Sequence, residues 1–241
     1  KEKLGIVKNS DFVLVSKQKK EVKDFINKKL VKKNNVFYYG TNFKINKINT
    51  HNFEFKFGNL KKTFNKPKLN GAHQVENATV ALAFLELIEK QKIKLDFKKV
   101  KTAIKETTWP GRLEILNYKN KIVILDGSHN IDGAKKLNEF LKSKKIKPII
   151  IFGMLNNKKI ETFLKLIKKQ ITSLLAIKIP NEKNAYFPDQ IAKKCNEMSI
   201  NCNKIQNITE ALNKIEESKK KYFLITGSLY LVGKIRSRFI S

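Results

Sequence analysis

In the second half of the chain, short apolar runs alternate with stretches in which apolar residues recur every three or four positions. The runs predict β-strands at residues 122–126, 148–152, 174–179 and 222–226, with a shorter one at 203–206. The stretches between them predict helices at 131–142, 158–169, 188–198 and 209–218, with a last one from about 229. Apolar strands separated by amphipathic helices indicate an α/β domain whose mostly parallel sheet is covered on both faces.

The first half of the chain mixes strand and helix patterns. Apolar runs predict strands at 11–16, 36–39 and 43–48. Between the first two, Val22, Ile26 and Leu30 recur every four residues in a lysine-rich helix that we expect to end near residue 33. The strict alternation of phenylalanines over 53–57, followed by a Gly-Asn turn, predicts a β-hairpin with one apolar face. Helices are expected at about 76–90 and again after Asp96, which is a good N-cap residue.

The segment Thr107-Thr108-Trp109-Pro110-Gly111 interrupts this pattern. Pro-Gly breaks a helix, and the regular strand–helix alternation begins only after it. We therefore expect one domain at residues 1–108 and a second at 109–241, which the length of 241 residues accommodates.

The large net charge of the chain says little about its function. The chain carries 51 Lys and Arg against 21 Asp and Glu, a formal net charge of +30, but all except three of the basic residues are lysine. Proteins that read bases and phosphates favour arginine, whose planar fork binds two acceptors at once. The lysines are spread along the whole chain without aromatic interleaving, so we interpret them as solvated side chains and expect no specific nucleic-acid partner.

Two further classes of protein are disfavoured. No apolar run approaches the ~20 residues that a membrane helix needs, so we expect no membrane partner. Only Cys195 and Cys202 are present, with no histidine cluster beside them. This argues against a disulfide framework or a zinc site and favours a reducing, cytoplasmic setting.

Polar residues gather where two of the predicted strands end. One strand runs into Asp126-Gly127-Ser128-His129-Asn130, and another into Thr226-Gly227-Ser228. Ligands bind parallel α/β domains at the carboxyl ends of the strands. An aspartate there can accept hydrogen bonds from a ribose or an amine, and a histidine beside it can orient an anion. The alternative is that Asp126 and Asn130 only cap the following helix.

Two other positions attract attention. Arg112 is the only arginine in the first 235 residues, so a role that needs guanidinium geometry, such as holding a phosphate, is favoured over an interdomain salt bridge. His73 and Asn77 are four residues apart near a helix start, and an Asn amide can bind an adenine edge. The structural alternative for that pair is simple helix capping.

Four ordered motifs carry a family resemblance: GAHQVENA at 71–78, WPGRLE at 109–114, LDGSHN at 125–130 and TGSLYLVG at 226–233. In this order they resemble bacterial folylpolyglutamate synthase/dihydrofolate synthase of the Mur ligase superfamily. The opening EKLGIVK at 2–8 resembles the Glu-Lys-Ala-Gly-Ile segment of that family. The resemblance implies a truncated central ATPase domain at 1–108, followed by a Rossmann-like glutamate ligase domain at 109–241.

The resemblance also implies a reaction. An ATP-dependent ligase of this kind activates the carboxylate of a pteroate or folate as an acyl phosphate, with Mg²⁺ as cofactor. The amino group of L-glutamate then attacks to form an amide, and ADP and phosphate leave. Fixed cations and metal stabilise the charge that develops on the phosphate. The family implies a monomer whose partners are these small-molecule substrates.

Site residues follow from the motif positions of the family. The resemblance implies that Asn77 contacts adenine, Asp126 the ribose and Arg112 the phosphates. His129 is expected close to the reaction centre near the incoming glutamate, with Ser228 as a further contact in that site. Domain closure would exclude water from the acyl phosphate.

Lys3 matches a family lysine that carbon dioxide converts to a carbamate, which helps to hold magnesium. On residue pattern alone, a lysine among so many others is a solvated one. The family also carries a Gly-x-x-Gly-Lys-Ser/Thr phosphate loop ahead of that segment, and no such loop occurs in this sequence. We therefore expect that the chain is the carboxyl-terminal part of a longer protein and does not catalyse ligation alone.

Two other functions remain open from sequence. One is a different Mur-type ligase that joins an amino acid to a cell-wall precursor; the WPGRLE and TGSLYLVG stretches favour the folate branch. The other is a non-catalytic basic binding module, whose affinity for anions would fall steeply with salt.

Overall fold

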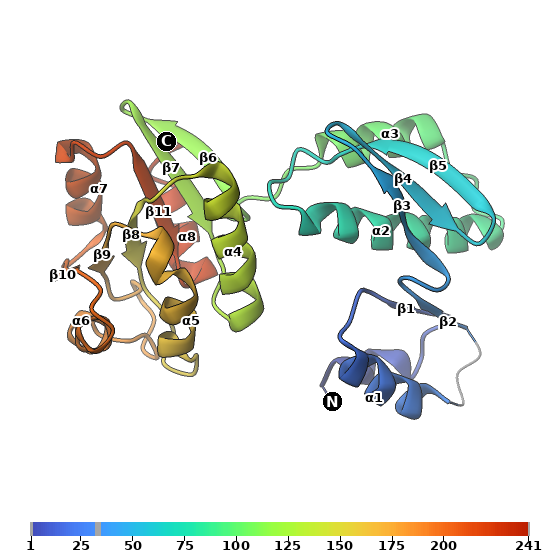
Figure 1. The fold of residues 1–241 in the computed structure, drawn as a ribbon, viewed down its shortest axis with the longest axis horizontal. Helices are drawn as coiled ribbons and strands as arrows, with labels where there is room; N and C mark the ends of the chain where they lie inside the picture. The colour runs from blue at the N-terminus through green and yellow to red at the C-terminus, as the bar shows by residue number, and fades with distance from the viewer. Residues whose placement is uncertain (1, 32–34, 241) are drawn as a thin grey trace. The chain divides into compact units, whose positions relative to one another are not determined.

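The computed structural model describes residues 2–31 and 35–240, except for the side chains of residues 2 and 3. Its internal contacts divide the chain into two compact units. The first contains the chain up to Lys68 together with Ala72–Thr108, and the second contains Leu69–Gly71 and the chain from Trp109 onward. Figure 1 shows the helices and strands of both units as a ribbon.

A six-stranded sheet forms the centre of the second unit. Its strand order is β10-β9-β8-β11-β7-β6, and its bounds are β6 (Glu114–Tyr118), β7 (Lys121–Asp126), β8 (Ile149–Phe152), β9 (Ser173–Ala176), β10 (Cys202–Lys204) and β11 (Tyr222–Thr226). All neighbours pair in parallel except β6 with β7. The predicted α/β fold with a mostly parallel sheet is therefore confirmed.

Helices cover both faces of this sheet, as the alternation of patterns predicted. They are α4 (Ile131–Lys144), α5 (Ile160–Ile167), α6 (Pro188–Glu197), α7 (Ile208–Glu217) and α8 (Leu229–Arg236), with a short 3-10 turn η2 (Lys168–Gln170) after α5. Successive residues of β7 point to opposite sides, because side chains alternate along a strand. Ile124 packs in a core with α4, α5 and α6, whereas Val123 and Leu125 pack in a second core with α7 and α8.

Strand β6 was not predicted. It pairs antiparallel with β7 through the two-residue turn Lys119-Asn120, in which both residues have positive φ. Such a turn usually carries glycine, and its absence hides the hairpin from sequence patterns. The strand places the segment 111–114 beside the end of β7.

The first unit contains two smaller sheets. Strands β1 (Val13–Val15) and β2 (Val36–Tyr38) form a parallel pair, and β3 (Phe43–Ile48), β4 (Asn52–Phe57) and β5 (Leu60–Asn65) form an antiparallel sheet. The helices are α1 (Lys20–Leu30), α2 (His73–Lys90) and α3 (Phe97–Glu106), preceded by the 3-10 helix η1 (Glu2–Val7). Helix α2 begins three residues before its predicted start.

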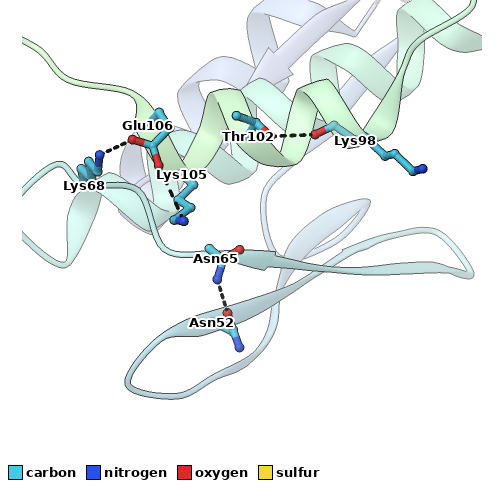
Figure 2. A network of polar contacts seen from close by, with 7 residues as sticks. All are labelled: Asn52, Asn65, Lys68, Lys98, Thr102, Lys105 and Glu106. Carbon is cyan, nitrogen blue, oxygen red and sulfur yellow. Dashed lines mark hydrogen bonds and ion pairs between the residues drawn. The ribbon is translucent and has the colours of Figure 1, made fainter.

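The predicted hairpin supplies the core of this unit. Phe53, Phe55 and Phe57 are buried, as their alternation predicted, and they pack with Phe64 and with Leu82 of α2. Polar contacts link β4 with β5, and the chain after β5 with α3 (Figure 2). The Asn65 side chain donates to Asn52 Oδ1 at 3.0 Å, and Lys68 forms an ion pair with Glu106 at the end of α3.

Candidate functional site

The register of the parallel sheet brings two of the predicted loops together. Asp126 and Thr226 are direct neighbours at the carboxyl ends of β7 and β11. The loops that follow them carry His129 and Ser228. The structure thus gathers Asp126, His129 and Ser228 at the sheet edge where parallel α/β domains bind ligands.

Asp126 is buried and holds backbone amides. Its side chain is 4% exposed. Oδ2 accepts from the Leu113 N–H at 3.1 Å, and Oδ1 accepts from the Ser128 N–H at 3.1 Å. Burial raises the pKa of Asp126, while these hydrogen bonds and the positive charge of Arg112 act against the rise without cancelling it. The carboxylate therefore fixes the segment around Leu113 to the end of β7.

A second set of contacts holds the same segment. The Gly127 N–H donates to the Gly111 carbonyl at 2.8 Å, and the Gly111 N–H donates to Glu114 Oε2 at 2.8 Å. Arg236 of α8 in turn holds Glu114 through two nitrogens, with Nε 2.9 Å from Oε2 and Nη2 2.9 Å from Oε1. Burial works to raise the pKa of Glu114, but the Arg236 and Gly111 hydrogen bonds outweigh it and the pKa lies below its ordinary value.

Sequence reasoning missed the roles of Glu114 and Arg236. The two residues lie 122 positions apart, so no local pattern links them. One signal was available, because Arg236 is among only three arginines in a lysine-rich chain. The argument that a rare arginine marks a need for guanidinium geometry applies to Arg236 as well as to Arg112.

The contacts above hold residues 111–114, which we call the braced segment. Arg112 lies inside it and is half-buried. Its backbone N–H donates to the Trp109 carbonyl at 3.2 Å, and the next residue, Leu113, has a positive φ of 48°. Within the described part of the second unit, no carboxylate forms an ion pair with the Arg112 guanidinium. The positive charge of Arg112 acts to lower the pKa of the buried Asp126. The arginine expected to hold phosphates is therefore available to an anion in this unit.

His129 has a defined ring orientation. Its Nδ1 lies 2.9 Å from the Gly127 carbonyl oxygen. A carbonyl only accepts, so Nδ1 carries the hydrogen and Nε2 is the acceptor of the neutral ring. No described residue hydrogen-bonds to Nε2. The ring is half-buried, which places an oriented acceptor beside the strand end.

The loop after β11 is tied to the loop after β7. The Gly227 N–H donates to the Ser128 carbonyl at 3.1 Å. Gly227 has a φ of +101°, and a Cβ atom there would lie 2.6 Å from the Gly153 carbonyl oxygen, so only glycine fits. Ser228 is 3% exposed, and its Oγ accepts from the Tyr230 N–H at 3.1 Å. Ser228 is thus the N-cap of α8.

The helix-capping alternative for the loop after β7 is correct for Asn130 and wrong for Asp126. Asn130 caps α4, because its Oδ1 accepts from the Gly133 N–H at 2.8 Å. Asp126 does not cap α4, since its carboxylate is directed at Leu113 and Ser128.

Two predicted site residues lie in the first unit. Asn77 is exposed on α2, and its Nδ2 donates to Gln74 Oε1 at 2.9 Å, so the amide is partly engaged within its own helix. Lys3 falls within η1, but its side chain lies outside the described residues. Within the second unit, the structure brings the other candidates together.

A magnesium site needs several oxygen ligands close together. Over residues 2–31 and 35–240, no group of three or more His, Cys, Asp and Glu side chains is placed to hold a metal ion. At the strand ends, the Asp126 and Glu114 carboxylates are both occupied by hydrogen bonds from the protein. The described residues do not by themselves form a magnesium site.

The fold and the polar strand ends define a class: an α/β domain with its candidate site at the carboxyl ends of a mostly parallel sheet. Comparison with known families is more specific. The profile described as "Dihydrofolate synthetase, C-terminal domain" matches residues 112–238, more than half of the chain. The chain belongs to the dihydrofolate synthase/folylpolyglutamate synthase family.

Relatives of known sequence and structure agree with this assignment. The chain is 30% identical over 195 residues to dihydrofolate synthase/folylpolyglutamate synthase of Bacillus subtilis, covering 77% of this chain and 44% of the relative. Folylpolyglutamate synthase of Thermotoga maritima matches with a TM-score of 0.75 at 27% identity, covering 100% of this chain and 56% of that one. The chain spans about half the length of the proteins it matches.

Structures of the family with ligands show the same fold at lower identity. Escherichia coli FolC in complex with DHPP and ADP has a TM-score of 0.73 at 18% identity, covering 89% of this chain and 50% of that one. The Yersinia pestis bifunctional synthase, complexed with AMPPNP and Mn ion, has a TM-score of 0.73 at 17% identity, with 90% and 50% covered. Nucleotide and metal binding are thus known for these relatives.

Among the helices of the described residues, none is long and apolar enough to cross a membrane.

Proposed function

We propose that this chain is part of an ATP-dependent ligase that adds glutamate to dihydropteroate, to folate or to both, through an acyl phosphate. The family match over 112–238 carries the proposal. The second unit would be the Rossmann-like glutamate ligase domain, and the first unit would be part of the Mur-type central ATPase domain. The braced Arg112 and the oriented His129 support this assignment, because both lie at the ends of β7 and β11 or in the segment bonded to them.

Each candidate residue has a physical role in this proposal. The Arg112 guanidinium would bind phosphate oxygens, since it has no ion-pair partner among the described residues of its unit. Nε2 of His129 would accept a hydrogen bond from the amine of the incoming glutamate and so orient its lone pair. Ser228 would act through its cap on α8, which fixes the backbone at the same edge. Asp126 is proposed to contact ribose through the lone pairs that the Leu113 and Ser128 amides leave unused.

The contact between Asn77 and adenine stays a prediction, as does the carbamate on Lys3. Magnesium, when bound, would supply positive charge next to the phosphates. The described residues offer no carboxylate cluster for it, so its ligands would have to include groups other than those at the strand ends. We therefore assign no reaction step of this chain to the metal.

The ligation proposal can be tested with a substrate panel. The purified chain and the Bacillus subtilis relative would be incubated with ATP, Mg²⁺ and glutamate, together with dihydropteroate, a folate or a cell-wall precursor, and products read by mass spectrometry. We expect glutamylated pteroate or folate from the relative and none from this chain, which spans only 44% of that protein. Robust ligation by this chain would refute the expectation that it is inactive alone.

A binding measurement tests the phosphate role of Arg112 separately. ADP titrated into the chain is expected to bind at least about tenfold more weakly to Arg112→Ala than to the unchanged protein, because a charge-assisted phosphate contact is lost. Arg238→Ala removes the same charge from an exposed position and is the control. If both variants lose affinity equally and the loss tracks salt, the nucleotide binds through the +30 net charge and the non-catalytic basic module is favoured.

A further inference from the structure

The chain has only two cysteines, and the fold of the second unit brings them together. Cys195 lies in the last turn of α6, and Cys202 is the first residue of β10. Both are free thiols. Six residues separate them in the sequence, so their meeting depends on how the chain turns between the helix and the strand.

The chain reverses direction directly after α6. The N–H groups of Met198 and Ile200 both donate to the Cys195 carbonyl oxygen, at 3.0 and 2.9 Å. Between them, Ser199 has a positive φ of 55°, the left-handed conformation that commonly ends a helix. The chain then enters β10, where Cys202 pairs in register with a residue of β9. These backbone contacts fix the end of the helix next to the start of the strand.

The two side chains lie on the same face of the sheet. Leu174 of β9, the register partner of Cys202, packs in the core that α4, α5 and α6 cover. Residues in register on neighbouring strands point to the same face, so Cys202 points toward α6. Cys195 belongs to that core, and Cys202 packs against it. The two thiols are in hydrogen-bond contact there.

The two thiols differ in how easily a reagent can reach them. Cys195 is 0% exposed, whereas Cys202 is half-buried on β10, the edge strand of the sheet. Cys202 Sγ lies 3.9 Å from the Asn203 carbonyl oxygen. The hydrogen bond from Cys195 lowers the pKa of Cys202, while the same contact and burial raise the pKa of Cys195. The accessible thiol is thus also the one that ionises more readily, and a thiolate is the nucleophile in exchange with disulfides.

We propose that Cys195 and Cys202 are a redox-active dithiol that forms a reversible intramolecular disulfide. Cys202 would react first with a small-molecule disulfide, and the buried Cys195 would then complete the bond. The pair lies apart from the residues assigned to ligation, so the inference does not rest on the proposed function. One pair of this kind is a modification site rather than a structural disulfide framework.

The chemistry is two successive thiol–disulfide exchanges. The Cys202 thiolate attacks one sulfur of the reagent, whose S–S bond breaks, and one small thiolate leaves and takes up the proton that Cys202 lost. The Cys195 thiol then loses its proton and attacks Cys202 Sγ, and the second small thiol leaves with that proton. The protein is oxidised by two electrons, and the reagent is reduced to two thiols.

The experiment reads the oxidation state of both cysteines at once. The reduced full chain is incubated with oxidised glutathione, its remaining thiols are blocked with iodoacetamide, and the protein is digested with trypsin. Both cysteines fall in the peptide 195–204, because no lysine or arginine lies between Lys194 and Lys204. Mass spectrometry is expected to show this peptide with two hydrogens fewer and without glutathione. Dithiothreitol should restore the reduced peptide.

Matched single variants separate the two roles. Cys195→Ala is expected to keep one glutathione on Cys202, because the thiol that would displace it is absent. Cys202→Ala is expected to react at least about tenfold more slowly than the unchanged chain, because only the buried thiol remains. Circular dichroism checks that both variants fold. If Cys195→Ala does not fold, iodoacetamide labelling of the unchanged chain replaces it, and Cys202 should be labelled at least about tenfold faster than Cys195.

The urea-unfolded chain is the control for the placement of the thiols by the fold. The equilibrium constant for exchange with glutathione should be at least about tenfold larger for the native chain than for the unfolded one. Three outcomes overturn the proposal. They are an equilibrium constant no larger in the native chain, a glutathione that stays on Cys202 of the unchanged chain, and a Cys202→Ala variant that reacts as fast as the unchanged chain.

Discussion

The two parallel sheets of this protein differ in completeness. In the second unit, five parallel strands and one antiparallel strand are covered by helices on both faces, and strands β8 and β11 are buried almost throughout. In the first unit, the β1–β2 pair has the same kind of strand and an amphipathic helix, yet Val22 and Phe25 of that helix remain about two-fifths exposed. The comparison shows that an apolar pattern indicates which side of an element faces its neighbours, but not how completely that side is buried.

The partly exposed apolar face of α1 is confined to one part of the first unit. The antiparallel sheet β3–β5 is closed by α2 and buries Phe43, Phe53, Phe55 and Phe64 almost completely. Antiparallel hairpins need no crossover and form from neighbouring residues, so this sheet can complete itself within the chain. The contrast therefore separates a subregion with a closed apolar core from one whose helix keeps apolar side chains partly exposed.

The largest expected effect comes from a substitution in the buried six-stranded sheet of the second unit. Phe223 in β11 is fully buried, and Phe223→Ala should destabilise the second unit by about 3–5 kcal/mol through lost packing and the cavity left behind. Phe25→Ala on α1 is the counterpart, and it should cost less than about 1 kcal/mol because the ring is already partly solvated. Urea unfolding followed by circular dichroism measures both. Equal losses would mean that the apolar face of α1 is packed as tightly as the core.

A smaller effect is expected from the braced segment of the second unit. Glu114→Gln should cost about 1–3 kcal/mol at pH 7, because the Arg236 guanidinium loses its charged partner. The pKa of Glu114 is below its ordinary value of about 4.3, so the pair stabilises the fold above that pH and the stabilisation is lost as pH falls through the lowered pKa.

The pH dependence supplies the check on that pair. Urea unfolding of the unchanged chain and of Glu114→Gln is measured from pH 7 to pH 3, and the difference between them should shrink toward the acid end. Glu216→Gln is the control, since that carboxylate pairs with the exposed Lys119. The buried Asp126, whose pKa is raised, contributes with the opposite sign but is common to all three proteins. A difference that stays constant with pH would rule out the ion pair as its origin.

The smallest effect concerns the exposed ion pair of the first unit. Lys68 and Glu106 are 56% and 43% exposed, and Figure 2 shows Lys105 as a second lysine beside the same carboxylate. Solvent and salt screen such a pair, so Lys68→Ala should leave the urea midpoint unchanged within error. A clear destabilisation would show that the end of α3 depends on this contact, and the distinction between the exposed and the braced ion pairs would fail.

Local patterns were sufficient for most of the second unit. The strand ends at Asp126 and Thr226 were predicted to the residue, because apolar runs stop sharply where polar loops begin. A break in the helix pattern was predicted at Pro110-Gly111, because two helix breakers stand together. The same patterns placed Asp126, His129 and Ser228 at one edge through the general rule for parallel sheets.

Other features depend on contacts that no local pattern records. Strand β6 leads into a Lys-Asn turn without glycine, and the Glu114–Arg236 pair joins residues from opposite ends of the unit. Asp126 is buried, and its carboxylate accepts the amide of Leu113, the residue before β6. Sequence alone identified this aspartate as a candidate site residue but did not reveal that it also holds the backbone in place.

The cross-connected loops after β7 and β11 have a consequence for hydrogen exchange. The amides of Gly127, Ser128 and Gly227 each donate to a group of the other loop, of the segment at 111–113 or of the strand end itself. Protons bonded in this way exchange with solvent only when the larger unit opens. In deuterium oxide these three amides should therefore exchange as slowly as the central strands, so the candidate site has the lifetime of the core although it is built from loops.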